Sequence, residues 1–273
     1  MSRTAIPADP VNTSHPRQPQ ERATVYVITG SHACRTATLM LEHKRIPYRH
    51  VVLPSGLHPL LVRAAGFPGN RESIRTVDGA TPPQIAVLDR LGTVPALRLG
   101  GMRVQTNHEI ALFLDRVQPE PALFPSDSEQ RRAVARAATW GDKTLQMAAR
   151  RVALAASLDS MSLRGADGRL GPLLARSPWM RTLLSRNAGS LFRAGPGNEA
   201  QLLSEVPPLL DRIDAWIGDG ILGAEHLTVA DFVIAPSVAL LSYHQALREQ
   251  IAARPAGALI DRLLPEPRAS ALR

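Results

Sequence analysis

The sequence predicts an α/β unit at residues 23–118, followed by an all-helical unit at residues 126–273. Strand-like and helix-like patterns alternate in the first part, whereas only helical patterns follow Pro125. The 273 residues, of which 44% are hydrophobic, are enough for two domains with a substantial core. We therefore expect the fold class α/β plus all-α, with the α/β part built as βαβ followed by ββα.

Composition narrows the functions that this chain can have. The net charge is +8, and the 32 basic residues include only two lysines, Lys44 and Lys143, so the others are arginines scattered along the chain. Diffuse basic charge is typical of a solvated surface. Aromatic residues make up only 4%, too few for a base-stacking surface. We therefore expect no nucleic-acid partner, although a basic surface favours small anionic ligands.

The sequence also limits the cellular location of the protein and its ability to bind metal. No window of 18 apolar residues lacks a charge, so we expect no membrane partner. Cys34 is the single cysteine, which excludes an internal disulfide and a cysteine-cluster zinc site, and the histidines lack metal-binding spacing. We expect no metal, and we expect a cytoplasmic location because a reducing compartment is the default for such a chain.

The N-terminal region begins with a proline-rich leader and continues with a βαβ pattern. Residues 1–22 hold four prolines and no periodic apolar pattern, which predicts a disordered leader. Thr24–Thr29 is a β-branched run that predicts a strand, Cys34–Lys44 has helical spacing, and Tyr48–Leu53 predicts a second strand. Because a βαβ crossover is right-handed, we expect the two strands to be parallel.

A long insertion separates this unit from a hairpin. A short helix is expected at residues 58–65. Residues 66–91 are long for a connection, and they form either a tolerated surface insertion or a segment that covers the functional site. A Gly-Gly pair between the apolar alternations of Thr93–Leu99 and Met102–Gln105 predicts a two-residue hairpin.

Two capping boxes mark helix starts. Thr106 with Glu109 begins the helix after the hairpin. Residues 119–125 are rich in proline and are expected to link the two domains. Thr228 and Asp231 form a second box, before the most apolar helical pattern. Helices are expected near residues 127–158, 170–194, 200–217, 228–250 and 254–264.

Four local patterns resemble those of the cytosolic glutathione S-transferase family, in the same order and at about the same spacing. They are the strand start Val94-Pro95-Ala96-Leu97, the helix entry Gln105-Thr106 with Ile110 and Leu114, the linker Leu123-Phe124-Pro125 and the capping box Thr228–Asp231. The resemblance implies a thioredoxin-like N-terminal domain and a helical-bundle C-terminal domain that supplies an apolar substrate pocket. It also implies a bacterial, serine- or cysteine-type enzyme that conjugates glutathione, as co-substrate, to an electrophilic small molecule, and that forms a homodimer.

Four residues are expected to bind the thiol peptide. A cis bond at Pro95 would turn the backbone N–H and C=O of Val94 outward from the sheet edge, where they can pair with an extended peptide. Gln105 and Thr106 lie at a predicted helix start, whose free N–H groups and positive dipole end attract a carboxylate. The resemblance implies that this pair holds the γ-glutamyl end of glutathione, and Thr106 can also cap its own helix.

Two residues near the first helix are candidates for the chemistry. The resemblance to serine-type transferases implies that the Ser31 hydroxyl donates a hydrogen bond to a bound thiolate. Alternatively, Cys34 carries the chemistry, because a helix start lowers the pKa of a thiol. The string His32-Ala33-Cys34 resembles that of the cysteine-type transferases, and an exposed Cys34 would also suit a thiol reductase or isomerase. The remaining alternative is that Cys34 is a half-buried small residue. His32 lies in the predicted turn, where a histidine is more often solvated.

The sequence leaves two questions open: which thiol the protein binds, and whether the protein is an enzyme. The co-substrate is glutathione or another low-molecular-weight thiol. A non-catalytic thiol-binding or protein-interaction module on the same fold is the alternative to an enzyme, because a fold does not fix a function.

Overall fold

The computed structural model describes residues 22–28, 30–54, 56–70, 91–156 and 192–264. Three sequence predictions fall wholly or mostly outside these ranges. They are the disordered leader at 1–22, the greater part of the insertion at 66–91 and the helix at 170–194.

A four-stranded sheet forms the centre of the N-terminal part, in the order β2-β1-β3-β4. The two strands of the predicted βαβ unit are parallel, and β3 runs antiparallel to both of its neighbours. Gly100 and Gly101 connect β3 to β4 with φ angles of 59° and 75°, which the predicted two-residue hairpin turn requires. The strands are β1 (Ala23–Ile28), β2 (Tyr48–Leu53), β3 (Ala96–Leu99) and β4 (Met102–Gln105).

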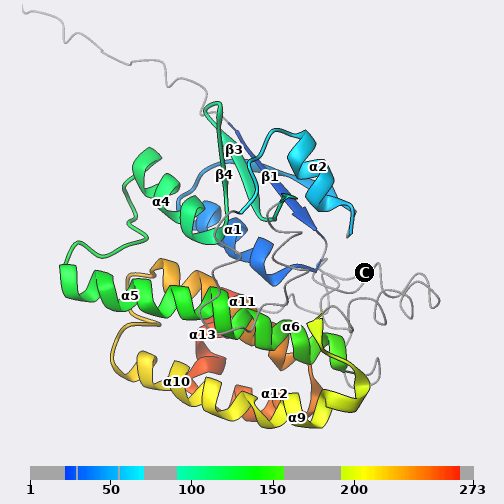
Figure 1. The fold of residues 1–273 in the computed structure, drawn as a ribbon. Coiled ribbons are helices and arrows are strands. Elements are labelled where there is room, and N and C mark those ends of the chain that lie inside the picture. The colour runs from blue at the N-terminus through cyan, green and yellow to red at the C-terminus, as the bar shows by residue number, and fades with distance from the viewer. Residues whose placement is uncertain (1–21, 29, 55, 71–90, 157–191, 265–273) are drawn as a thin grey trace, which may run out of the picture.

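Helices lie on both faces of this sheet (Figure 1). One face packs against α1 (His32–His43) and α4 (Asn107–Val117), and it buries Val25 and Val27 in the main hydrophobic core. The other face carries α2 (His58–Ala64), where a smaller cluster forms around Val62, Phe67 and Ala96. Together with the order of the strands, this arrangement confirms the thioredoxin-like N-terminal fold.

The C-terminal part is helical throughout the residues that the structure describes, as predicted (Figure 1). The helix expected near 127–158 is one continuous rod of three segments, whose middle is a π-helical turn, η1. The elements are α5 (Ser128–Trp140), η1 (Gly141–Leu145), α6 (Gln146–Ala155), the short 3₁₀ turn η2 (Pro196–Asn198), α9 (Glu199–Ser204), α10 (Val206–Gly218), α11 (Val229–Ser242), α12 (Gln245–Ala252) and α13 (Pro255–Leu263).

Two predicted helices are each divided in the structure. The helix expected at 228–250 is wrong as one element, because α11 ends at Ser242 and His244 caps the new helix α12 by accepting from the Ala246 N–H at 3.2 Å. The helix expected at 200–217 also consists of two helices, because Glu205 separates α9 from α10.

Helix α11 is the central element of the helical part. It is buried from Val229 to Leu241, and it packs against α5, α6, α12 and α13 and also against α1 of the N-terminal part. The predicted capping box at its start is present, with the Asp231 carboxylate accepting from the Thr228 N–H at 2.7 Å. One hydrophobic core therefore runs from the sheet into the helical domain. None of the described helices is long and apolar enough to cross a bilayer.

Candidate functional site

The predicted site residues gather at one end of the sheet. Tyr26 pairs with Ala96, and Ala96 pairs with Gln105, so the end of β1, the start of β3 and the end of β4 lie side by side. The turn into α1 follows β1 directly, and the start of α4 follows β4 directly. The topology thus places Ser31, Cys34, Val94, Pro95, Gln105 and Thr106 around one edge of the N-terminal domain.

Ser31 is the N-cap of α1 and is half-buried. Its Oγ accepts a hydrogen bond from the Cys34 N–H at 3.2 Å, which satisfies one of the free donors at the helix start. A serine hydroxyl also carries one proton that it can donate. The Ser31 hydroxyl can therefore stabilise an anion at the positive end of the helix.

Cys34 lies in the first turn of α1 and is buried, with 4% of its surface exposed. Burial raises the pKa of its thiol, and the hydrogen bond with Ser31 offsets this effect only in part. The thiol form is consequently favoured at neutral pH, whereas a cysteine nucleophile reacts as the thiolate.

His32 connects the start of α1 to the helical domain. The expectation that it is solvated is wrong, because only 9% of its surface is exposed and its Nε2 lies 3.2 Å from the backbone oxygen of Gln146. Burial, followed by the charge of Arg150, lowers the pKa of His32 to about 3. The imidazole is therefore neutral and joins α1 to α6 as a structural contact.

Arg150 is a charged residue close to the candidate site that the sequence did not indicate. It projects from α6, where its guanidinium lies 5.1 Å from the centre of the Phe192 ring. Burial lowers the pKa of His58 at the start of α2, and the charge of Arg150 lowers it further, as it does for His32. The field of Arg150 therefore reaches the turn that holds Ser31.

The peptide bond between Val94 and Pro95 is cis, as the sequence predicted. Pro95 is buried and Val94 is half-buried, immediately before β3.

Gln105 has both ends of its side chain engaged inside the protein. Its Oε1 accepts from the Gly69 N–H at 2.8 Å, and its Nε2 donates to the Thr93 oxygen at 2.8 Å. The residue is 6% exposed. In this conformation, Gln105 fixes the backbone one residue before Val94.

Thr106 caps α4 from a strained backbone position. Its Oγ1 accepts from the Glu109 N–H at 3.3 Å, and its φ and ψ are 68° and 148°. A β-branched residue rarely adopts a positive φ, and such strain is often found where a chain binds a ligand. Thr106 therefore presents the free donors at the start of α4 in a fixed orientation.

Asp142 is a further titratable residue that no sequence pattern singled out. It lies in η1, where its Oδ1 accepts from Asn107 Nδ2 at 3.1 Å. Asn107 directly follows Thr106 at the start of α4. Burial raises the pKa of its carboxyl to about 6. The carboxylate thus places a negative charge beside the start of α4, and π-helical turns are frequent at functional sites. Among the described residues, no cluster of His, Cys, Asp or Glu could hold a metal ion.

Comparison with known proteins identifies the fold. No family model and no curated protein matches the sequence. A GST-like protein from Pseudomonas syringae has a TM-score of 0.54 and 18% identity, and the match covers 90% of this chain and 67% of that chain. A glutathione S-transferase from Methylobacterium radiotolerans, in complex with glutathione sulfonate, has a TM-score of 0.50 and 21% identity, with 91% and 92% covered.

A glutathione S-transferase I bound to lactoylglutathione has a TM-score of 0.55 and 15% identity, with 92% of this chain and 97% of that chain covered. Each of these matches covers at least 90% of this chain, so it includes both the sheet and the helical part. The chain therefore has the glutathione S-transferase fold, a thioredoxin-like domain followed by a helical domain.

Proposed function

We propose that this protein is a glutathione S-transferase-like enzyme of the serine type. It binds glutathione, or another low-molecular-weight thiol, and joins the thiol sulfur to an electrophilic small molecule. The thiol loses its proton to solvent, the thiolate attacks the electrophilic carbon, and a carbon–sulfur bond forms while the bond to the leaving group breaks and that group departs with its electron pair. The observation that carries this proposal is the half-buried Ser31 hydroxyl at the start of α1.

The assignment of Ser31 rather than Cys34 is supported by burial. Ser31 is half-buried and has a proton to donate to a bound thiolate, whereas the Cys34 thiol is buried and its pKa is raised by that burial. The positive end of α1 and the Arg150 guanidinium favour the same negative charge. A Cys34-dependent reductase or isomerase would need an accessible thiol.

The thiol peptide is proposed to bind along the entry to β3 and the start of α4. The backbone of Val94, before Pro95, pairs with the peptide as an added strand would. Thr106 and the free N–H groups of α4 hold the γ-glutamyl carboxylate. Gln105 acts as a positioning residue, because its amide already fixes the backbone at Thr93.

The experiment that tests this proposal separates binding from turnover. Isothermal titration with glutathione, and separately with other low-molecular-weight thiols, measures binding, and conjugation of a chromogenic electrophile measures turnover. Ser31→Ala is expected to lower turnover by at least about tenfold, since removal of one donor from an oxyanion hole costs about a hundredfold or more. Cys34→Ala is the matched comparison and is expected to have the smaller effect. The opposite ranking would transfer the chemistry to Cys34.

A second candidate is a thiol-binding or protein-interaction module without turnover. It is favoured by Gln105, because both polar ends of this side chain are already bonded to the backbone of the chain. Thiol binding without conjugation of any electrophile in a broad panel would support this candidate over the enzyme.

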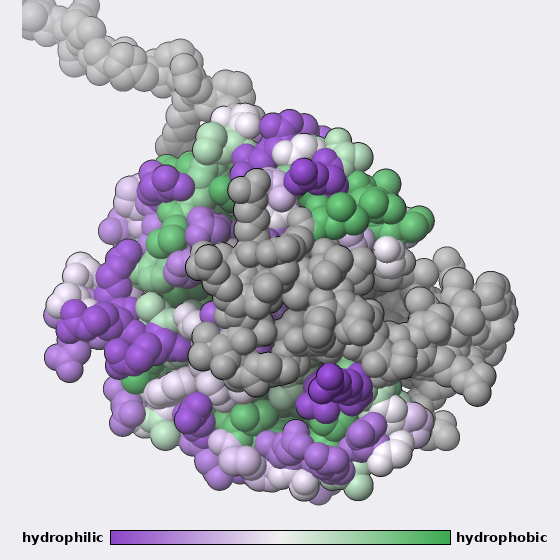
Figure 2. Space-filling view, viewed as in Figure 1, coloured by the Kyte–Doolittle hydropathy of each residue, from purple (hydrophilic) through white to green (hydrophobic). Residues whose placement is uncertain are grey.

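We further propose that the protein forms a homodimer and works in the cytoplasm. Figure 2 shows hydrophobic residues gathered over α2, and Leu57, Leu60 and Leu61 are 56%, 56% and 41% exposed there. Exposed apolar patches of this kind often mark protein interfaces. Light scattering coupled to size-exclusion chromatography is expected to give twice the chain mass of 29.5 kDa. A mass of one chain would refute the dimer.

A further inference from the structure

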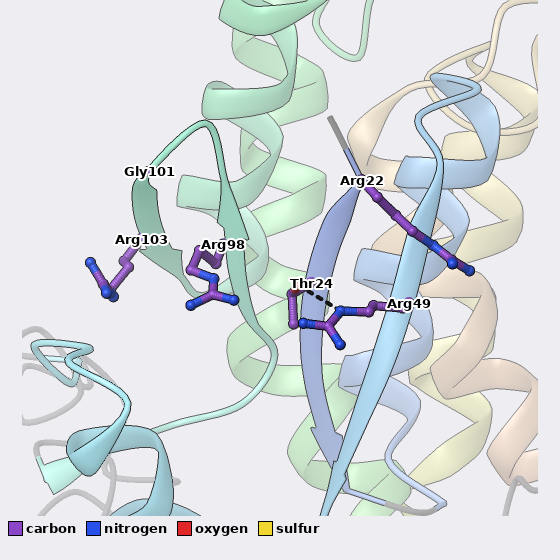
Figure 3. Close-up of a pocket in the computed structure, with 6 residues that line it drawn as sticks. All are labelled: Arg22, Thr24, Arg49, Arg98, Gly101 and Arg103. Carbon is purple, nitrogen blue, oxygen red and sulfur yellow. Dashed lines mark hydrogen bonds between the residues drawn. The ribbon is translucent and has the colours of Figure 1, made fainter. Parts of the chain in front are cut away.

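A basic hollow of about 420 Å³ lies on the α2 side of the sheet (Figure 3). Residues alternate between the two faces of a strand. Ala23 and Val25 point into the main core, so Thr24 points to the opposite face, where Tyr26 packs against Phe67. The hollow lies at the start of β1, whereas the candidate thiol site lies beyond its end. Its lining residues are Arg22, Thr24, Arg49, Arg98, Gly101 and Arg103.

The register of the sheet places this lining in one row. Thr24 pairs with Arg49 on β2 and with Arg98 on β3, and Arg98 pairs with Arg103 on β4. Figure 3 shows Arg49 and Arg98 on the two sides of Thr24, with Arg22 and Arg103 at the outer ends. Strand pairing therefore places Arg49, Arg98 and Arg103 in one row across the sheet, and Arg22 lies beyond Arg49 at the end of that row.

Three of these guanidinium groups are fixed through Nε. Arg22 donates to the Tyr48 oxygen at 2.9 Å, Arg49 donates to Thr24 Oγ1 at 3.2 Å, and Arg103 donates to the Ala65 oxygen at 3.1 Å. An arginine held in this way is oriented but retains its terminal donors, which form the fork that matches the oxygens of a phosphate.

The described residues that line the hollow carry positive charge and no negative charge. Four of the six are arginines, and none of the six is acidic. In the part of the chain that the structure describes, no ion pair involves any of its four arginines, whereas Arg35 and Arg254 do pair with carboxylates. Like charges gathered in one hollow repel one another, and a bound anion would relieve this repulsion.

We propose that this hollow binds an anion that contains a chain of linked phosphates. Its volume is within the range of small-molecule sites. The four guanidinium groups lie in succession across the hollow, and linked phosphates present negative charges in succession along one chain. The ligand is a nucleoside triphosphate or an inorganic polyphosphate, because both carry this chemistry. The site is separate from the thiol site and does not depend on the proposed enzyme activity.

Titration calorimetry on the full chain, at low ionic strength, tests this proposal with inorganic tripolyphosphate, ATP and orthophosphate. Tripolyphosphate or ATP is expected to bind at least about tenfold more tightly than orthophosphate, since each added charged hydrogen bond contributes on the order of 1.5 kcal/mol or more. Tighter binding of ATP would identify a nucleotide as the ligand, and tighter binding of tripolyphosphate would identify the inorganic chain. Equal affinity for orthophosphate, or no binding of any of the three, would overturn the proposal.

Variants of matched charge locate the site. The pair Arg49→Gln and Arg98→Gln is expected to weaken binding by at least about tenfold, whereas Arg132→Gln with Arg136→Gln, on the exposed face of α5, is expected to leave it unchanged. An equal loss in both pairs would show non-specific attraction and would overturn the proposal.

Two further measurements keep the test decisive. If the glutamine pair does not fold, Arg98→Lys keeps the charge but removes the fork, and it is expected to weaken tripolyphosphate binding several-fold while leaving the melting temperature unchanged. Unchanged affinity in this variant would overturn the proposal.

A competition experiment distinguishes linked phosphates from a nucleic acid. A single-stranded DNA 12-mer is added to the complex with tripolyphosphate. If the DNA displaces tripolyphosphate and binds more tightly, the ligand is a nucleic acid and the proposal fails.

Discussion

The Lys44 ammonium has no exposed surface and donates to Asp115 Oδ1 at 2.5 Å. The same carboxylate accepts from the N–H groups of Leu123 and Phe124. Lys44 also donates to the backbone oxygens of residues 118 and 119. One buried ion pair therefore holds together the end of α1, the end of α4 and the segment that leads into the helical domain.

Lys44→Met is expected to destabilise the fold by about 3 kcal/mol, since removing one partner of a buried pair leaves the other charge without compensation. Urea denaturation followed by circular dichroism measures the change. Lys143→Met, at the other lysine of the chain and exposed in η1, is the control and is expected to have little effect. Similar midpoints for the two variants would contradict a structural role for the ion pair.

Cys34 is expected to react slowly with a disulfide reagent in the native protein. Its thiol is buried and its pKa is raised by that burial, so reaction requires an opening of the start of α1. Labelling at pH 7.5 should be at least about a hundredfold slower than in denaturant. Fast native labelling would show an accessible thiolate and would favour the cysteine-type mechanism.

Thr106 variants separate its cap from its strained backbone. Thr106→Ala loses a cap that contributes about 1 kcal/mol and keeps a side chain at a φ of 68°. Thr106→Gly also loses the hydroxyl, but glycine adopts a positive φ without strain. The melting temperature of the glycine variant should therefore be higher than that of the alanine variant. Both should raise the KM for the thiol if Thr106 also holds the peptide, and the reverse order of melting temperatures would exclude backbone strain.

The carboxyl of Asp142 is expected to make stability depend on pH. Its pKa is raised from 3.8 to about 6 by burial, so the folded state binds the proton more tightly than the unfolded state does. Its contribution to stability is full below pH 3.8 and is lost as the pH rises through about 6. Asp142→Asn still accepts from Asn107, so its melting temperature should exceed that of the wild type at pH 7.5 and approach it at pH 4.

Asp261→Asn, at an exposed position of α13, is the control for this pH series and should parallel the wild type. A constant difference between Asp142→Asn and the wild type across the pH range would mean that Asp142 does not titrate as described.

Gly141→Ala is expected to destabilise the helical domain. A Cβ at this position would lie 2.8 Å from Val233 Cγ1 and 3.0 Å from Ile234 Cγ1, so α11 would have to move away from the π-helical turn. Gly218→Ala, in α10 with nothing within 4 Å of the added Cβ, is the control and should be neutral or stabilising. Equal melting temperatures for the two variants would show that the contact between η1 and α11 is loose.

Local patterns carried the successful sequence predictions. The caps at Thr106 and Thr228, the Gly-Gly hairpin and the cis bond at Pro95 each depend on residues within a few positions of one another. By contrast, the break between α11 and α12 contains neither glycine nor proline. It depends on His244, which caps α12 and lies 2.9 Å from Glu199, 45 positions away.

The same limit applies to the candidate site. Ser31 was predicted through the resemblance to serine-type transferases, and Thr106 through its place at a helix start, whereas Arg150 and Asp142 lie within continuous helical patterns. The positions of Arg150 and Asp142 near these residues depend on tertiary packing, which places α6 against the start of α1 and η1 against the start of α4. No spacing rule within one segment contains this information.

Gln105 makes two connections of the N-terminal domain depend on one side chain. Its amide accepts from Gly69 on one side and donates to Thr93 on the other, so the segment after α2 and the entry to β3 are anchored at a common point at the end of β4. A single substitution that removes this amide would therefore release both segments at once, and the cis bond before Pro95 would lose the support that lies one residue before Val94.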